Sequence, residues 1–186
     1  MTDAAELVSA DHYLDHVERG HEWVEGRLVV LPPMTLTVNR VMSLIARQLW
    51  QTGGFEHVAV SGYRVRTGPR RYREPDVLYT ADLDAWPNRV AESLDLAVEV
   101  VGGDEEGRDR DEDRDRDYVT KRQEYAAAGF PEYWIVDPDR RTITALVLDG
   151  AEYREAAVAG DGDAVVSHVL PAFSVDVTEL FDAAGA

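Results

Sequence analysis

The sequence contains no cysteine, and its 19 lysine and arginine residues include one lysine, Lys121. The absence of cysteine excludes disulfides, thiolate metal sites and cysteine nucleophiles. No run approaches the roughly 18 consecutive apolar residues of a membrane span. The N-terminus lacks the basic start and apolar centre of a signal peptide, so we expect a cytoplasmic protein with no membrane partner. Because nearly every other cation is an arginine, Lys121 stands out.

Acidic residues outnumber basic residues by 36 to 19, which gives a formal net charge of −17 at pH 7. Proteins that bind nucleic acid through charge alone rely on lysine and arginine side chains that neutralise phosphates, so the overall charge argues against such a surface. A nuclease is still compatible with it, because a local basic cleft or divalent cations held by carboxylates can accept a phosphodiester. Arg70, Arg71 and Arg73 form one local basic cluster, which we predict to lie in a loop.

Hydrophobic periodicity predicts an α/β fold that forms one domain over residues 1–186. A short helix capped by Ser9 precedes a hairpin over 21–33, and a second helix begins at Thr35 or Thr37. The predicted strands cover 57–66 (one kinked strand or two), 75–80, 95–101, 132–137 and 141–150, with weaker strands and a last helical turn after them. Strands 95–101 and 132–137 fit a βαβ crossover whose helix runs from about Asp111 to Ala128. Residues 102–116 alternate in sign and are predicted to form a flexible acidic and arginine-rich loop.

Two carboxylates and the lysine require an explanation. Glu99 lies within the apolar strand 95–101, where an ionised carboxylate normally pairs, becomes neutral or binds a metal. Asp76 starts the strand 75–80, and Lys121 lies on a helix from which it can reach back toward Glu99. The alternatives are a solvated or arginine-paired Glu99 and a surface ion pair between Lys121 and Asp117, four residues earlier. Two carboxylates and one ammonium are the groups that metal-assisted phosphodiester hydrolysis requires.

The residues that carry these groups also carry a family resemblance. The order PDV at 75–77, VEVV at 98–101 and YVTKRQEYAAAGFPEYWIVDP at 118–138 resembles the Uma-type family of the restriction-endonuclease-like superfamily, whose motif is PD-(D/E)XK. The resemblance extends to HEWVEGRLVVLPP, Asn39 and LPAFSVDVTELF, and covers most of the chain. It implies a restriction-endonuclease-like mixed β-sheet core flanked by helices, with an N-terminal helix and β-hairpin.

The resemblance also implies an activity, namely hydrolysis of phosphodiester bonds in nucleic acid with Mg²⁺ or Mn²⁺ as cofactor. DNA is the expected substrate in preference to RNA. Asp76 and Glu99 are then the expected metal ligands, together with the backbone carbonyl of Val100. The superfamily motif places its lysine at position 101, which is Val101 here. In the Uma-type branch the lysine has moved to the following helix, so Lys121 is expected to assist the attacking water.

Other matching positions leave alternatives open. Glu22 matches a family glutamate that reaches the same metal, but an exposed carboxylate on the hairpin would fit as well. Tyr125 and Asp137 also match, and a structural role would explain both.

Cleavage of both strands of a duplex would favour a two-fold homodimer. The acidic loop is longer than the family pattern and puts substrate access in doubt. The net charge of −17 supports one alternative function, that of a nuclease fold that has lost catalysis and acts as an acidic interaction or regulatory module. The retention of Asp76, Glu99 and Lys121 argues against this alternative.

Overall fold

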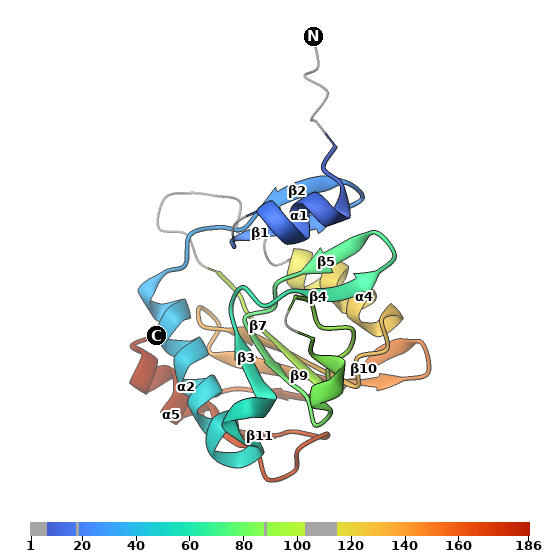
Figure 1. Cartoon of the computed structure of the whole chain (residues 1–186). Coiled ribbons are helices and arrows are strands. Elements are labelled where there is room, and N and C mark those ends of the chain that lie inside the picture. Colours follow the sequence, from blue (N-terminus) through green and yellow to red (C-terminus); the bar gives the residue numbers. More distant parts are fainter. Residues whose placement is uncertain (1–6, 18, 88, 103–114) are drawn as a thin grey trace.

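The computed structural model describes residues 7–17, 19–87, 89–102 and 115–186. Figure 1 shows a mixed α/β arrangement in which a large sheet is packed against helices and a smaller sheet lies above it. The large sheet has the strand order β10-β9-β8-β7-β6-β3. Its strands are β3 (Val58–Val60), β6 (Val77–Tyr79), β7 (Leu96–Val100), β8 (Glu132–Asp137), β9 (Thr142–Asp149) and β10 (Glu152–Ala159). Strands β7 and β8 are parallel and their other pairings are antiparallel, which confirms the predicted βαβ crossover in a mixed sheet.

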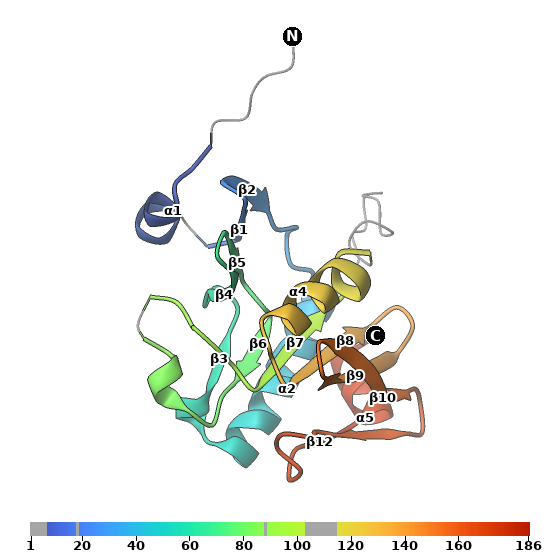
Figure 2. The ribbon, with the colours of Figure 1, turned by 90° about the vertical axis from the view of Figure 1, so that its right-hand side faces the viewer.

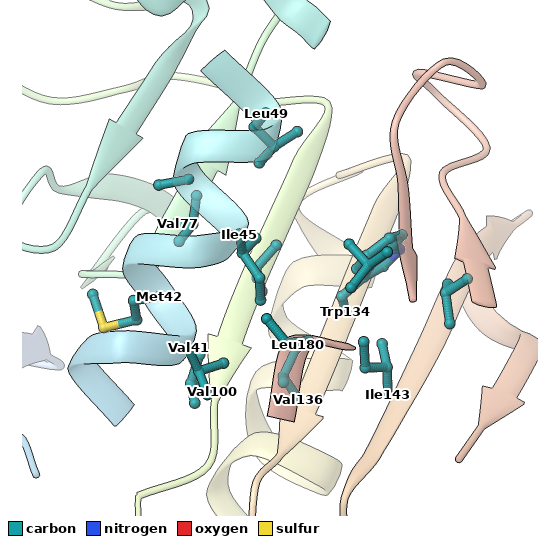
Figure 3. Close-up of a cluster of buried hydrophobic side chains, with 14 of the residues drawn as sticks. Val41, Met42, Ile45, Leu49, Val77, Val100, Trp134, Val136, Ile143 and Leu180 are labelled. Atoms are coloured by element: carbon teal, nitrogen blue, oxygen red, sulfur yellow. The ribbon is translucent and has the colours of Figure 1, made fainter. Parts of the chain in front are cut away.

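One face of the large sheet packs against α2 (Leu36–Gly53) and α5 (Val177–Ala184), and Figure 3 shows the apolar side chains buried between them. Thr35 caps α2 by accepting a hydrogen bond from the Val38 N–H (3.3 Å), at one of the two predicted starts of this helix. The buried cluster includes Val41, Ile45 and Leu49 from α2, Val98 and Val100 from β7, and Trp134 and Val136 from β8. Burial of one such aliphatic side chain contributes roughly 1.5–3 kcal/mol, so α2 fixes β7 firmly.

The other face packs against a helix that begins with a π-helical turn, η3 (Arg116–Lys121), and continues as α4 (Arg122–Ala127). Tyr125 of α4 meets Tyr133 of β8 edge to face, with ring centroids 5.0 Å apart. π-Helical turns are rare and are frequently found at functional sites. Residues 103–114, which hold most of the predicted acidic loop and the predicted start of this helix, lie outside the described residues.

The smaller sheet has the strand order β2-β1-β5-β4. Its strands are β1 (His21–Val24), β2 (Arg27–Val30), β4 (Val65–Gly68) and β5 (Arg71–Arg73). Strands β1 and β2 form the predicted hairpin; its turn residues Glu25 and Gly26 have φ values of 52° and 87°, and two positive φ values are typical of a type I′ turn. The helix α1 (Ala10–His16) packs Tyr13 against Trp23 of β1. Figure 2 shows α1 and the hairpin together at one end of the molecule.

The segment between α2 and β6 departs from one prediction. Residues 57–66 contribute to two strands, β3 and β4, which belong to different sheets. The basic cluster was expected in a loop, but Arg71 to Arg73 form β5, which pairs with β4 and β1. Strand alternation turns Tyr72 toward the aromatic cluster beneath α1 and Arg73 to the opposite side, where it is 4% exposed. The loop prediction is therefore wrong, because a pairing with distant β1 organises this segment.

The remaining elements are short. They are the strands β11 (Ala164–Val166) and β12 (Ser174–Asp176), which pair with each other, and the single turns η1 (Phe55–His57) and η2 (Leu83–Ala85). Asp176 caps α5 by accepting a hydrogen bond from the Glu179 N–H (2.8 Å), in agreement with one of the two predicted caps. Within the described part of the chain, no helix combines the length and the apolar character that crossing a membrane requires.

Candidate active site

The pairing of β6 with β7 brings Asp76 and Glu99 together. Val77 pairs with Val98 in this antiparallel ladder, and continuing the register by one residue places Asp76 opposite Glu99. Residues directly opposite each other on antiparallel strands have Cβ atoms roughly 4.5–5.5 Å apart and point to the same face of the sheet. The two carboxylates therefore share the face that packs against α4.

Each carboxylate is oriented by a specific donor. The Val100 N–H donates a 2.7 Å hydrogen bond to Asp76 Oδ2. The Tyr125 hydroxyl donates a 2.6 Å hydrogen bond to Glu99 Oε1, while Lys121 Nζ lies 2.9 Å from Glu99 Oε2. Glu99 and Lys121 are each only 3% exposed, so neither a solvated glutamate nor a surface lysine describes them.

Lys121 lies among three carboxylates. Besides Glu99, its Nζ lies 3.2 Å from Asp117 Oδ1 and 3.7 Å from Glu22 Oε1. Burial alone would lower the pKa of Lys121, but Asp117, Glu99 and Glu22 together raise it above its ordinary value, so the ammonium stays charged. The π-helical turn carries both Asp117 and Lys121, so one short segment places a carboxylate and an ammonium next to each other and next to Glu99.

Asp117 is the site residue that sequence reasoning missed. It was considered only as the partner in a surface ion pair, yet it is 2% exposed. Its Oδ1 is within ion-pair distance of Lys121, but no well-aligned hydrogen bond from the described residues reaches this atom. A signal was present, because Asp117, Lys121 and Tyr125 recur at four-residue spacing and therefore share one helix face.

Burial controls the protonation of the two opposed carboxylates. It raises the pKa of Asp76 to about 6, although Lys121 and the Val100 N–H oppose this shift. Burial likewise raises the pKa of Glu99, and the nearby Asp76 and Asp117 carboxylates add to the effect while Lys121 opposes it. Perturbed carboxylates in a cleft are a feature of functional sites.

A pocket of about 170 Å³ opens over this cluster. Asp76, Glu99, Asp117 and Lys121 form its polar side, with Val100 beside them. The segment between β2 and α2 and the first turn of α2 also line it, through Leu31, Pro32, Pro33, Met34, Thr35 and Val38. Ser61, Glu74 and Arg116 are further polar residues of the lining. The pocket thus combines buried charged groups with a group of mainly apolar residues from one segment.

Glu22 lies beside the cluster but does not line the pocket. It is fully buried, so the exposed hairpin carboxylate considered above is wrong. Arg73 Nη1 donates a 2.6 Å hydrogen bond to Glu22 Oε2 and binds both oxygens of Glu124 through Nε and Nη2, at 2.7 and 2.8 Å. Burial raises the pKa of Glu22, but Lys121 and Arg73 outweigh it, so the net pKa is below the ordinary value.

The same contacts change the interpretation of the basic cluster. Arg73 is buried against two carboxylates and is not available to phosphate groups. Arg70 lies 3.0 Å from a carboxylate oxygen of Glu25, and Arg71 lies 3.7 Å from the other. The three arginines therefore do not form one phosphate-binding surface. Asp137 accepts a 3.1 Å hydrogen bond from the Arg140 N–H and so caps the turn after β8.

The pocket offers the oxygen ligands that a hard divalent cation prefers, but its described residues do not provide a complete coordination shell. Asp76, Glu99 and the Val100 carbonyl provide oxygen ligands of the kind that Mg²⁺ and Mn²⁺ prefer. Among the described residues, no group of three histidine, aspartate or glutamate side chains is arranged to hold a metal ion; the three carboxylates around Lys121 surround its ammonium instead. A cation would thus need water or substrate oxygens to complete its coordination, as Mg²⁺ commonly does.

A mixed sheet with paired carboxylates and a lysine beside its parallel strands defines a nuclease-like fold, and the comparisons with known proteins agree. A sequence model described as "Uma2: Putative restriction endonuclease" matches residues 9–178, and the chain belongs to this family. A crystal structure described as "a putative nuclease belonging to DUF820 from Anabaena variabilis ATCC 29413" is similar, with a TM-score of 0.70 and 16% identity over 95% of this chain and 99% of that chain. At this identity the likeness establishes the fold. No curated protein matches the sequence.

Proposed function

We propose that the protein is a Mg²⁺- or Mn²⁺-dependent endonuclease that hydrolyses phosphodiester bonds of nucleic acid, DNA before RNA. The observation that carries the proposal is a buried lysine held between carboxylates at the base of an open pocket. Burying that many ionisable groups is costly unless they are paired or bind a cation. Membership of a family described as a restriction endonuclease supports nuclease chemistry in general.

In the proposed site, Asp76, Glu99 and the Val100 carbonyl hold the cation. When bound, a divalent cation polarises a phosphoryl oxygen and makes a water molecule more acidic. Tyr125 fixes the orientation of Glu99 through its 2.6 Å hydrogen bond. Lys121 is placed to donate a hydrogen bond to the attacking water or to a phosphate oxygen, where its charge offsets the developing negative charge.

Asp117 and Glu22 act in this proposal through Lys121. Both carboxylates lie within 4 Å of the ammonium, at 3.2 and 3.7 Å. They can therefore hold Lys121 in place when Glu99 is engaged with the cation. Arg73 already occupies one oxygen of Glu22, which supports a positioning role for Glu22 over direct ligation of the metal.

The test is calorimetric titration of MgCl₂ and MnCl₂ into the wild type and into Asp76→Ala with Glu99→Ala, alongside a nuclease assay on DNA and RNA. We expect binding and cleavage by the wild type and loss of both in the double variant. Glu152→Ala, which removes an exposed acid on β10, is the control for the loss of negative charge. Circular dichroism must show that the double variant is folded.

The net charge of −17 favours one competing function, that of an acidic interaction module on a lapsed nuclease fold. Such a protein would bind neither cation at the pocket and would cleave no substrate under the same conditions. Absence of cleavage with both metals and all substrates, together with absence of cation binding, would replace the proposed nuclease by this module.

A further inference from the structure

The pocket has a second feature that the proposed chemistry does not use, an apolar wall that continues onto the surface. Leu31, Pro32, Pro33 and Met34 line the same pocket as the carboxylates. Met34 is 43% exposed, and Leu36, at the start of α2, is 65% exposed. We name the segment 31–36 the apolar loop. Large exposed apolar side chains that adjoin a functional pocket commonly mark a contact surface.

The apolar loop is held in place. Proline fixes φ at two consecutive positions, Pro32 and Pro33. Thr35 is anchored as the cap of α2, and the Asn39 side-chain amide donates a hydrogen bond of 3.4 Å to Met34 Sδ. The exposure of Met34 therefore belongs to a defined conformation, which gives a ligand a preformed surface.

The cations near the pocket do not suit a duplex. A protein that holds double-stranded DNA through charge neutralises several phosphates with lysine and arginine. Within the described residues, the pocket is lined by two cations, Lys121 and Arg116, and both lie within 4 Å of Asp117 Oδ1. Arg64 and Arg73, the two buried arginines among the described residues, bind glutamates. The part of the pocket lining that the structure describes thus offers apolar contacts from the apolar loop and two cations that are already paired with a carboxylate.

The size of the pocket points in the same direction. Its volume of about 170 Å³ is smaller than the roughly 300–1,000 Å³ typical of small-molecule sites. It can receive one phosphodiester and part of its sugar, so an adjoining base would lie outside it, and Met34 and Leu36 offer exposed apolar side chains there. A base presents a free apolar face only when it is unpaired and unstacked.

We propose that the substrate is single-stranded or locally unpaired nucleic acid, with its phosphodiester at the carboxylates and an adjoining base packed on Met34 and Leu36. This inference rests on the proposed function and names the substrate class of the same site. It also removes the reason for expecting a two-fold dimer, since cleavage of one strand requires one active site.

The binding test uses Asp76→Asn, which prevents turnover, and fluorescence anisotropy with a labelled DNA of about twelve nucleotides, presented as a single strand or as a blunt duplex. We expect the single strand to bind about tenfold more tightly than the duplex at physiological salt. Adding Met34→Ser and Leu36→Ser should weaken single-strand binding about tenfold, within the range for loss of one base contact. Val158→Ser with Val166→Ser is the matched control, because both side chains are exposed (61% and 56%) and lie on β10 and β11.

Hydrolysis of bis(p-nitrophenyl) phosphate by the protein with intact Asp76 separates this inference from the proposed function, because this small phosphodiester tests the chemistry without a nucleic-acid strand. Val158→Ser with Val166→Ser should leave this hydrolysis unchanged, and Met34→Ser with Leu36→Ser should reduce cleavage of the single strand more than hydrolysis of the small substrate. Equal binding of duplex and single strand, or no effect of the two serines on binding, would overturn the inference even if the small substrate is hydrolysed. A dimer in size-exclusion chromatography that the two serines dissociate would overturn it too, by assigning the apolar loop to a second copy. Selective single-strand binding without any hydrolysis would support the inference and reject the nuclease.

Discussion

Two glutamates on neighbouring parallel strands, Glu99 of β7 and Glu132 of β8, show how differently one residue type can be buried. Their exposed fractions are 3% and 0%. Glu99 faces α4, whereas Glu132 lies on the other face of the sheet, two residues before Trp134. Glu99 lies within a strand that is otherwise apolar and Glu132 is the first residue of a strand with an apolar centre, so local sequence alone does not reveal their different partners.

Their partners distinguish them. Glu132 accepts hydrogen bonds from four neutral donors within 2.6 to 3.1 Å, two on each oxygen. These donors are the Trp134 indole N–H, the Ser167 hydroxyl, and the backbone N–H groups of His168 and Val169. Glu99 has one hydroxyl and an ammonium that it shares with two other carboxylates. A buried carboxylate whose oxygens are saturated by neutral donors is a structural element; one that competes for a cation beside a pocket is available for chemistry.

The largest effect should come from removing the shared cation. Lys121→Met leaves Glu99 and Asp117 buried without their ammonium, and loss of one partner of a buried ion pair costs about 3–5 kcal/mol. Urea unfolding should show this loss, and nuclease activity should disappear. Arg154→Met, an exposed cation on β10, is the control and should change little. Wild-type stability of Lys121→Met would mean that the carboxylates are not ionised together, and the contrast with Glu132 would lose its basis.

The two glutamates can be compared directly by amide substitution. Glu132→Gln replaces one carboxylate oxygen by an NH₂ group, which cannot accept hydrogen bonds from the two donors that face it. Each buried donor left without an acceptor costs about 1–3 kcal/mol. Glu99→Gln leaves Asp117 and Glu22 beside the Lys121 ammonium, so its loss of stability should be smaller than that of Glu132→Gln. Activity should show the reverse order: lost in Glu99→Gln, and retained by the folded fraction of Glu132→Gln. Unfolding curves and rates measured on both variants check this, and equal destabilisation would contradict it.

The sequence was informative where local pattern determines structure. Continuous apolar residues identified β7, and the lone acid in that strand identified Glu99. Lys121 was found because a helix between two parallel strands must pack on the sheet between them. Asp76 was singled out because PDV at 75–77 matches the family motif, and the roles of Asp76 and Lys121 remain predictions from that resemblance. The elements that carry these residues needed only strand alternation, helix periodicity and the crossover, each of which is a property of a short segment.

The sequence was less informative where partners are distant in the chain. Arg73 was expected in a basic loop, but it binds Glu22 and Glu124, which are each 51 residues away in the sequence. Glu132 could not be recognised as structural because donors more than thirty residues later saturate it. Tertiary pairing of this kind leaves no periodic signal in either segment, and composition alone cannot reveal it.

The pH dependence of stability should separate Asp76 from ordinary carboxylates. Burial raises its pKa from 3.8 to about 6, so the native state binds a proton more tightly than the unfolded chain. The resulting stability is fully present below pH 3.8 and is lost as pH rises through about 6. In chelator, urea unfolding of the wild type should lose about 1–2 kcal/mol between pH 4.5 and 7.5 relative to Asp76→Asn, given that Asp76 is partly exposed to the pocket. Parallel pH profiles for the two proteins would refute the shift.

The smallest predicted effect concerns Asp117, which resembles Glu99 in burial but whose Oδ1 receives no aligned hydrogen bond from the part of the chain that the structure describes. If it positions Lys121, Asp117→Asn should lower kcat about tenfold, equivalent to about 1.4 kcal/mol, and leave the Kd for Mg²⁺ unchanged. Asp115→Asn, an exposed acid two residues earlier, is the matched control and should leave both quantities unchanged. Loss of Mg²⁺ binding together with activity would instead make Asp117 a metal ligand, and the distinction between ligand and positioning carboxylates in this pocket would then have to be redrawn.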